Sequence, residues 1–304
     1  MNRNPLVSID CTTYNHAPYI RQCLDGFLMQ KTNFAFEILI HDDCSLDGTD
    51  HIIREYEQKY PDIIKPIYQI ENQYSKGVSI SATFNYPRVK GKYIAWCEGD
   101  DYWTDPMKLQ KQVDFLEANP EYGMCYTQAK HWYQAENRFR SKIRGGDHET
   151  FMELLDKNTV PTLTAVFRAD LYCDYLEEIK PEIRHWRMGD YPMWLWLSHN
   201  SKIKFLPEVT GVYRILSVSA SHSSIYETNA AFIESTFEIK KFFLERYPQM
   251  NLSLDDIQQQ QYKRLFSLAF SYKKKDELTY FYKHLRRKSF KMYFKYWVRR
   301  YFWR

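Results

Sequence analysis

The chain of 304 residues is 44% hydrophobic and 26% charged, which is typical of a globular protein and excludes a disordered or fibrous one. Its longest apolar run, residues 193–197, is far too short to span a membrane, and the first residues lack the apolar stretch of a secretory signal. We therefore expect a cytoplasmic protein. The net charge of +4 is uneven, because residues 284–304 carry eight basic and no acidic side chains, which leaves residues 1–283 at −4.

The first 130 residues alternate between strand and helix patterns. Short apolar runs predict strands, and apolar residues at helical spacing predict the helices between them. Strands joined by crossover helices indicate a mostly parallel α/β sheet flanked by helices, in which ligands bind at the carboxyl ends of the strands. The expected strands are residues 6–11, 36–41, 63–70, 93–97 and 122–128, and the expected helices are residues 19–29, 49–60 and 105–118.

The second half of the chain is less regular. Residues 131–147 are polar and basic with two adjacent glycines, which is typical of a mobile loop. From about residue 223 onward the pattern is helical, so we divide the chain into an α/β region, residues 1–222, and a helical C-terminal region, residues 223–304. The six cysteines are scattered without zinc spacing and are predicted to be reduced thiols. Between the loop and the helical C-terminal region we expect a strand at residues 162–168, helices at 169–179 and 190–199, and two short strands within 203–214.

Polar residues follow the first two expected strands. Thr13, Tyr14 and Asn15 end the first strand, where hydroxyls and a ring can contact a nucleobase, or can simply begin the next helix. Asp42 and Asp43 end the second strand, where a carboxylate can accept hydrogen bonds from a base or a ribose. The alternative for this second segment is a turn that only caps the following helix.

Three carboxylates, those of Glu98, Asp100 and Asp101, follow the fourth expected strand. Placing them after a buried apolar strand is costly unless a cation neutralises them. Oxygen ligands favour Mg²⁺ or Mn²⁺ over Zn²⁺. A solvated acidic turn is the alternative, although the adjacent Tyr102 and Trp103 indicate a shaped pocket.

Together these segments resemble the family 2 glycosyltransferases of the GT-A fold, over about residues 5–215. The family's opening Thr-x-Asn loop matches residues 13–15, and its Asp-Asp-x-Ser-x-Asp-Gly-Thr signature matches residues 42–49, with cysteine at the usual glycine. Its Asp-x-Asp metal motif matches residues 98–100, with glutamate in place of the first aspartate. The resemblance implies a metal held by the last aspartate of this motif and by Asp101, with the glutamate in support.

The resemblance implies roles for other residues as well. Asp190, in a Gly-Asp pair that opens a helix, would be the catalytic base, and it can also cap that helix. Arg214 would pair with the leaving diphosphate, because guanidinium groups suit phosphate. Lys76 would replace the family's donor-site arginine. We expect the acceptor side to include the loop of residues 131–147 and three tryptophans, Trp186, Trp194 and Trp196.

The resulting prediction is an inverting, metal-dependent glycosyltransferase of the bacterial cell-surface polysaccharide type. It would move a hexosyl or N-acetylhexosaminyl group from a nucleoside diphosphate sugar, with a UDP-sugar favoured, to a glycan or lipid-linked acceptor. Two alternatives stay open. One is a sugar nucleotidyltransferase, which would not need Asp190, and the other is a non-catalytic, membrane-associated protein that binds sugar nucleotides.

The basic C-terminal segment predicts an interfacial helix over residues 290–301, which would hold the protein on the inner face of the plasma membrane. Each cation near anionic lipid contributes about 1 kcal/mol. The alternatives are docking on the catalytic domain and, last, nucleic-acid binding, because no nucleic-acid fold accompanies the segment. The helix would carry Phe290, Tyr293, Phe294, Trp297, Val298 and Tyr301 on one side, with Lys291, Lys295 and Arg299 beside them.

Overall fold

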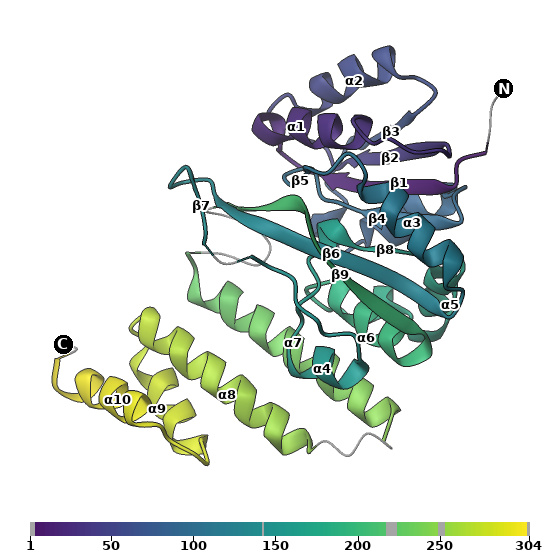
Figure 1. Cartoon of the computed structure of the whole chain (residues 1–304). Coiled ribbons are helices and arrows are strands. Elements are labelled where there is room, and N and C mark those ends of the chain that lie inside the picture. Colours follow the sequence, from purple (N-terminus) through teal and green to yellow (C-terminus); the bar gives the residue numbers. More distant parts are fainter. Residues whose placement is uncertain (1–3, 142, 217–223, 249–252, 303–304) are drawn as a thin grey trace. The chain divides into compact units, whose positions relative to one another are not determined.

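The computed structural model divides the chain into two compact units (Figure 1). One unit consists of residues 1–185 and 189–215, and the other consists of residues 186–188 and 216–304. Among the described residues, every strand lies in the first unit, and the second is helical. The residues that the structure describes are 4–141, 143–216, 224–248 and 253–302.

The first unit is built on one sheet with strand order β3-β2-β1-β4-β8-β6-β9-β5, and β7 pairs with β6. The strands β1 to β4 are parallel, whereas β8 is antiparallel to both of its neighbours and β6 runs parallel to β9. The predicted α/β class is confirmed, with a sheet that is mixed in its second half. The strands are β1 (Val7–Thr13), β2 (Phe36–Asp42), β3 (Ile64–Tyr68), β4 (Tyr93–Trp96), β5 (Tyr102–Trp103), β6 (Tyr122–Tyr133), β7 (Arg138–Phe139), β8 (Val166–Arg168) and β9 (Lys202–Ile215).

Helices cover both faces of this sheet. Alternate residues of β1, Val7 and Ile9 among them, join one core with the apolar sides of α1, α2 and α3. The opposite face carries Trp96, whose ring contacts Tyr172 of α5 and Trp194 of α6. The helices of this unit are α1 (Ala17–Leu28), α2 (Thr49–Lys59), α3 (Lys108–Ala118), α4 (Phe151–Asp156), α5 (Ala169–Ile179) and α6 (Asp190–Asn200).

Two sequence predictions for this unit are corrected. The expected loop 131–147 starts inside β6, and it includes β7 and a bridge between Ala129 and Arg144. The expected pair of short strands within 203–214 is one strand of 14 residues, β9. Pro207 cannot donate a ladder hydrogen bond, but the β6–β9 register shifts opposite it, so the pairing continues on both sides.

The second unit consists of α7 (Tyr226–Arg246), α8 (Leu254–Ser271), α9 (Lys275–His284) and α10 (Phe290–Phe302). Phe266, Leu278 and Leu285 form the buried centre of the cluster that joins these helices. Among the residues that the structure describes, none of the helices combines the length and the apolarity needed to cross a membrane. All six cysteines, which lie in the first unit, are free, as predicted.

Candidate active site

The carboxyl ends of β1, β2 and β4 lie side by side and bring the three polar segments together. The Asp43 N–H donates to the carbonyl oxygen of Thr13 (3.0 Å), and the Gly99 N–H donates to that of Thr12 (2.9 Å). A Cβ atom on Gly99 would lie 2.6 Å from Thr13 Oγ1, so only glycine allows this close approach. The sequence prediction that these segments meet at one sheet edge follows from parallel pairing, which puts their ends together.

The segment after β1 offers two side chains to a ligand. Thr13 is buried, and its Oγ1 has no hydrogen-bond partner among the described residues, whereas the ring of Tyr14 is exposed. Asn15 has a different role. It adopts a left-handed conformation with φ of 55°, and its Oδ1 accepts a hydrogen bond from the Leu46 N–H (2.8 Å), while its own N–H donates to Ser45 Oγ (2.8 Å). Asn15 therefore ties this loop to the loop after β2.

The two carboxylates after β2 are buried and hold loops. Asp42 accepts hydrogen bonds from the backbone and the hydroxyl of Ser45, and burial raises the pKa of Asp42. Asp43 accepts hydrogen bonds from the N–H groups of Gln73 (2.8 Å) and Tyr74 (3.0 Å). Because each carboxylate oxygen has two lone pairs, both groups keep acceptor capacity for a base or a ribose.

Lys76 lies in the turn η1 (Tyr74–Lys76), whose first residue is held by Asp43. Its side chain is exposed, and its Nζ forms an ion pair with Glu71. An exposed ion pair contributes at most about 1 kcal/mol. Lys76 can therefore exchange Glu71 for a phosphate group at little cost.

Glu98, Asp100 and Asp101 form the carboxylate cluster after β4. Each offers a carboxylate oxygen, and these oxygens lie within 4.8 Å of one another. The Asp101 N–H donates to the carbonyl oxygen of Glu98 (3.0 Å) and so closes the turn, and the buried Asp101 Oδ1 accepts a hydrogen bond from the Arg214 N–H (2.7 Å). Three converging oxygen donors fit the ligand preference of Mg²⁺ or Mn²⁺.

The electrostatics of the cluster favour a cation. Burial, followed by the charge of Asp100, raises the pKa of Asp101 well above its usual range. Burial of the carboxyl group, followed by the charges of Asp100 and Asp190, raises the pKa of Glu98 to about 8, although Glu98 as a whole residue is exposed to solvent. The ionised cluster is therefore short of positive charge, which a divalent ion would supply.

Arg214, on β9, fixes the backbone of this turn. Its guanidinium group lies over the rings of Tyr19 (5.0 Å to the centroid) and Tyr102 (4.6 Å), and it donates to Gln22 Oε1 and to the carbonyl oxygen of Asp100. These contacts hold the turn through the Asp100 carbonyl oxygen. The structure thus brings Arg214 to the cluster, and its predicted pairing with the diphosphate stays a prediction.

Asp190 is the first residue of α6 and is half-buried. Its Oδ2 accepts a hydrogen bond from Thr162 Oγ1 (2.6 Å), and its Oδ1 accepts one from the Tyr191 N–H (2.7 Å). The Asp190 charge is close enough to contribute to the raised pKa of Glu98. The structure therefore places a held carboxylate near the carboxylate cluster but outside it. Catalysis by Asp190 stays a prediction.

The structure adds two residues that the sequence prediction missed. The Nδ1 atom of His16 is buried without a hydrogen-bond partner among the described residues, and burial lowers the pKa of His16 against the opposing charge of Asp100. The Arg144 guanidinium lies 5.2 Å from the ring centroid of Tyr213, and its charge acts on Glu98. The only sequence signal for Arg144 is the Gly145-Gly146 pair that follows it, since its partners are remote in sequence.

The tryptophans predicted for the acceptor side lie elsewhere. Trp194 is 0% exposed and packs against Trp96, and Trp196 is 3% exposed and donates from Nε1 to Glu178 Oε2 (3.0 Å). The prediction that Trp194 and Trp196 contact an acceptor is therefore wrong for this conformation, because their ring faces are covered. Trp186 belongs to the helical unit, where it packs against Phe242, and its acceptor role stays a prediction.

Solved structures with a similar fold include complexes with nucleotide sugars, and their similarity extends over most of this chain. TarS from S. aureus in complex with UDP-GlcNAc has a TM-score of 0.56 at 18% identity, covering 86% of this chain and 80% of that one. Mannosyltransferase PcManGT from Pyrobaculum calidifontis, in complex with GDP-Man and Mn²⁺, has a TM-score of 0.56 at 18% identity, covering 77% of this chain and 64% of that one. The fold is therefore GT-A-like, with C-terminal helices.

Sequence comparison gives the family. Residues 8–174, more than half of the chain, match "Glycosyl transferase family 2", so the protein belongs to this glycosyltransferase family. It is 34% identical to the uncharacterized protein Rv1520 of Mycobacterium tuberculosis, over 72% of this chain and 61% of that protein. It is 35% identical to the UDP-Glc:alpha-D-GlcNAc-diphosphoundecaprenol beta-1,3-glucosyltransferase WfaP of Escherichia coli, over 37% of this chain and 41% of that one. The chain thus spans about three fifths or less of these relatives.

Proposed function

We propose that this glycosyltransferase is an inverting, metal-dependent enzyme of bacterial cell-surface polysaccharide synthesis. It would transfer a hexosyl or N-acetylhexosaminyl group from a nucleoside diphosphate sugar to a glycan or lipid-linked acceptor. One observation carries the proposal: the structure has a carboxylate cluster after β4 and a separately held carboxylate, that of Asp190, whose charge acts on Glu98 of the cluster. Metal binding and proton removal need two such sets of groups.

The donor would bind across the strand ends. Thr13 and Tyr14 offer a buried hydroxyl and an exposed ring to the base, and Asp43 keeps acceptor capacity for a base or ribose. Asn15 and Asp42 would support this site from the loops that they hold. The lysine of η1 would reach the diphosphate.

Asp100 and Asp101, with Glu98 in support, would hold Mn²⁺ or Mg²⁺ beside that diphosphate. The bound ion would act as a Lewis acid that stabilises negative charge on the leaving diphosphate. Arg214 would keep the turn in place, because it binds the Asp100 carbonyl oxygen and donates its own N–H to Asp101. Arg144 would add positive charge on the Glu98 side.

Asp190 would remove the proton from the acceptor hydroxyl. Thr162 holds one of its oxygens, so the carboxylate is oriented before the acceptor arrives. The acceptor oxygen forms a bond to the anomeric carbon as the bond from that carbon to the diphosphate oxygen breaks. Because the attack comes from the opposite face, a single displacement inverts the anomeric configuration.

The relatives support a donor and an acceptor of these classes. TarS and PcManGT are seen with UDP-GlcNAc and GDP-Man, and WfaP is named for UDP-Glc and a diphosphoundecaprenol-linked acceptor. A UDP-sugar is therefore the donor that we favour. A lipid-linked acceptor would place the reaction at the inner face of the plasma membrane.

The proposal is tested by a panel of sugar nucleotides, with Mn²⁺-dependent binding and slow hydrolysis as the readouts. We expect Asp100→Ala to lose the Mn²⁺ dependence of donor binding. Asp190→Asn should keep donor binding and lose roughly 10²- to 10⁴-fold in turnover, the usual contribution of a general base. The matched control is Asp174→Asn, because Asp174 is an exposed carboxylate of α5.

Two outcomes would contradict the proposal. If no sugar nucleotide binds and Asp100→Ala changes nothing, the protein is not a metal-dependent sugar-nucleotide enzyme. If Asp190→Asn keeps full turnover, a nucleotidyltransferase, which does not need this base, becomes the better interpretation.

A further inference from the structure

The inward side of α10 is already occupied within the helical unit. The ring of Tyr296 stacks on that of Tyr282 in α9, with centroids 4.2 Å apart and planes 5° apart. Met292 packs against the buried cluster of this unit, and Lys295 Nζ lies 4.8 Å from the ring centroid of Phe270 in α8. These contacts fix which side of α10 faces its neighbours.

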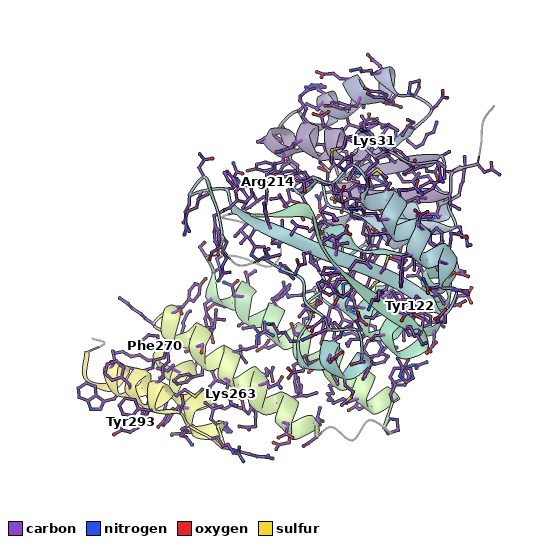
Figure 2. All side chains as sticks on the ribbon, in the orientation of Figure 1. Lys31, Tyr122, Arg214, Lys263, Phe270 and Tyr293 are labelled. Carbon is purple, nitrogen blue, oxygen red and sulfur yellow. The ribbon has the colours of Figure 1, made fainter. Side chains whose placement is uncertain are left out.

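The outward side of α10 is aromatic and exposed. At 100° per residue, Phe290, Phe294 and Trp297 fall on the side opposite Met292 and Tyr296. Tyr293 borders them and is labelled on α10 in Figure 2. The exposed fractions are 84% for Phe290, 56% for Tyr293, 54% for Phe294 and 40% for Trp297. The side chain of Tyr301, predicted for the same side, lies outside the described residues.

The charges around this aromatic face are positive. Residues 284–304 contain eight basic and no acidic side chains. Arg286 is paired with Asp255 and Asp256 of α8, whereas Arg287 and Lys291 are exposed close to the first turn of α10. A contiguous aromatic face with flanking cations is unusual on a protein surface unless it contacts something.

We propose that the outward face of α10 docks this protein, with the helix parallel to the surface, on a bilayer that contains anionic lipid. Amphipathic aromatic rings suit the headgroup region, and the adjacent cations would pair with lipid phosphates. The face is formed before binding, because Tyr296 and Met292 hold the opposite side of the helix. This inference does not depend on the transfer reaction, since it rests on the helical unit alone.

Charge favours a lipid surface over a second copy of the chain. A symmetric contact between two α10 faces would bring the same cations together, because each patch in such a contact meets its own copy. Like charges at close range oppose that contact, whereas an anionic surface is attracted to the whole group. Within the helical unit, neighbouring helices contact the Tyr296 side of α10, whereas Phe290 and Phe294 on the other side are exposed.

The test is co-sedimentation of the full chain, without sugar nucleotide, with vesicles of phosphatidylcholine mixed with phosphatidylglycerol. We expect binding to these vesicles, weak binding to pure phosphatidylcholine, and no change in helicity on binding. Arg287→Gln combined with Lys291→Gln should weaken partitioning roughly 25-fold, at about fivefold per cation. Phe294→Ser combined with Trp297→Ser should weaken it by about tenfold or more.

The matched control is Tyr280→Ser. Tyr280 is 50% exposed on α9, and it lies about 200° of helix rotation from Tyr282, which faces α10. This variant should bind vesicles like the parent, and circular dichroism should show that all variants fold. Unchanged binding by both double variants would overturn the proposal. The proposal would also be overturned if the double variants lost self-association, measured by sedimentation, while their vesicle binding was unaffected. In that case a second copy of the chain, and not a bilayer, would occupy the outward face of α10.

Discussion

Replacing Asp101 by asparagine separates the charge of the carboxylate cluster from its geometry. Asp101 is buried, and its Oδ1 accepts the Arg214 N–H at 2.7 Å, a bond that an asparagine Oδ1 can also accept. The substitution therefore removes a charge and leaves the turn intact. In the absence of metal, Asp101→Asn should raise the free energy of unfolding. In the presence of Mn²⁺, the parent should gain stability from metal binding, and the variant should lose this gain.

The size of the first effect follows from the separations within the cluster. Two full charges within 4.8 Å of each other repel by at least roughly 3.5 kcal/mol at an effective dielectric constant of about 20. Burial and the charge of Asp100 raise the pKa of Asp101, and this shift relieves part of the repulsion in the parent. We therefore expect a gain of about 1–2 kcal/mol, equivalent to roughly 2–8 °C in melting temperature for a unit of this size.

The assay is thermal unfolding of the parent and the Asp101→Asn variant, in chelator and in Mn²⁺. At a metal concentration of about 100 times Kd, the parent should gain roughly 2.7 kcal/mol, and the variant should gain much less. Asp62→Asn, at an exposed carboxylate, is the control and should match the parent in both conditions. A variant that is destabilised in chelator, or that Mn²⁺ stabilises as much as the parent, would refute the assignment of a metal to this cluster.

Three further predictions test the surroundings of the site. Gly99→Ala should lower the free energy of unfolding by about 1–3 kcal/mol and weaken donor binding, because the Cβ atom of the alanine would overlap Thr13. Denaturant unfolding measures the first effect and donor titration the second. A variant that matches the parent in both would contradict the need for glycine. Arg144→Gln should raise KM for the donor more than Arg140→Gln does, since the charge of Arg144, unlike that of Arg140, acts on Glu98. Equal KM values for the two variants would remove Arg144 from the site. Burial lowers the pKa of Lys108 to about 7, so between about pH 7 and about pH 10.5 the unfolded chain binds a proton that the folded chain lacks, and the free energy of unfolding should rise with pH. Denaturant titrations should show this rise in the parent and a flatter pH dependence in Lys108→Met. The same pH dependence in both proteins would contradict the prediction.

The first half of the sheet is predictable because its information is local. Each of the strands β1 to β4 is a short segment with several apolar residues, and right-handed crossovers make such strands parallel neighbours. The convergence of Thr13, Asp43 and Asp100 follows at once, since parallel strands end at the same edge. The antiparallel β8 and the long β6–β9 pairing depend on contacts between distant segments, and no local pattern specifies them.

The residues that the sequence prediction misplaced or missed also differ in whether their information is local in the sequence or comes from contacts between distant segments. Trp194 and Trp196 belong to a helix whose residues 191–197 are all buried, and a helix that is apolar on every side is a core helix. That signal was present in the sequence and argues against an acceptor role. For Arg144 the sequence offers only the adjacent glycine pair, because the Ala129–Arg144 bridge that positions its backbone pairs segments that are distant in sequence.

The turn that we propose binds the metal is shaped by protein contacts. Glycine at position 99 permits the close approach of β1, and Arg214 anchors both the Asp100 carbonyl oxygen and the Asp101 carboxylate. Arg214 is in turn fixed between Tyr19 and Tyr102, which come from elements on either side of the turn. A turn held in this way needs little rearrangement when a cation binds. Loss of metal binding after a charge-only substitution can therefore be assigned to the missing charge, whereas loss after a change at Arg214 would report on the geometry.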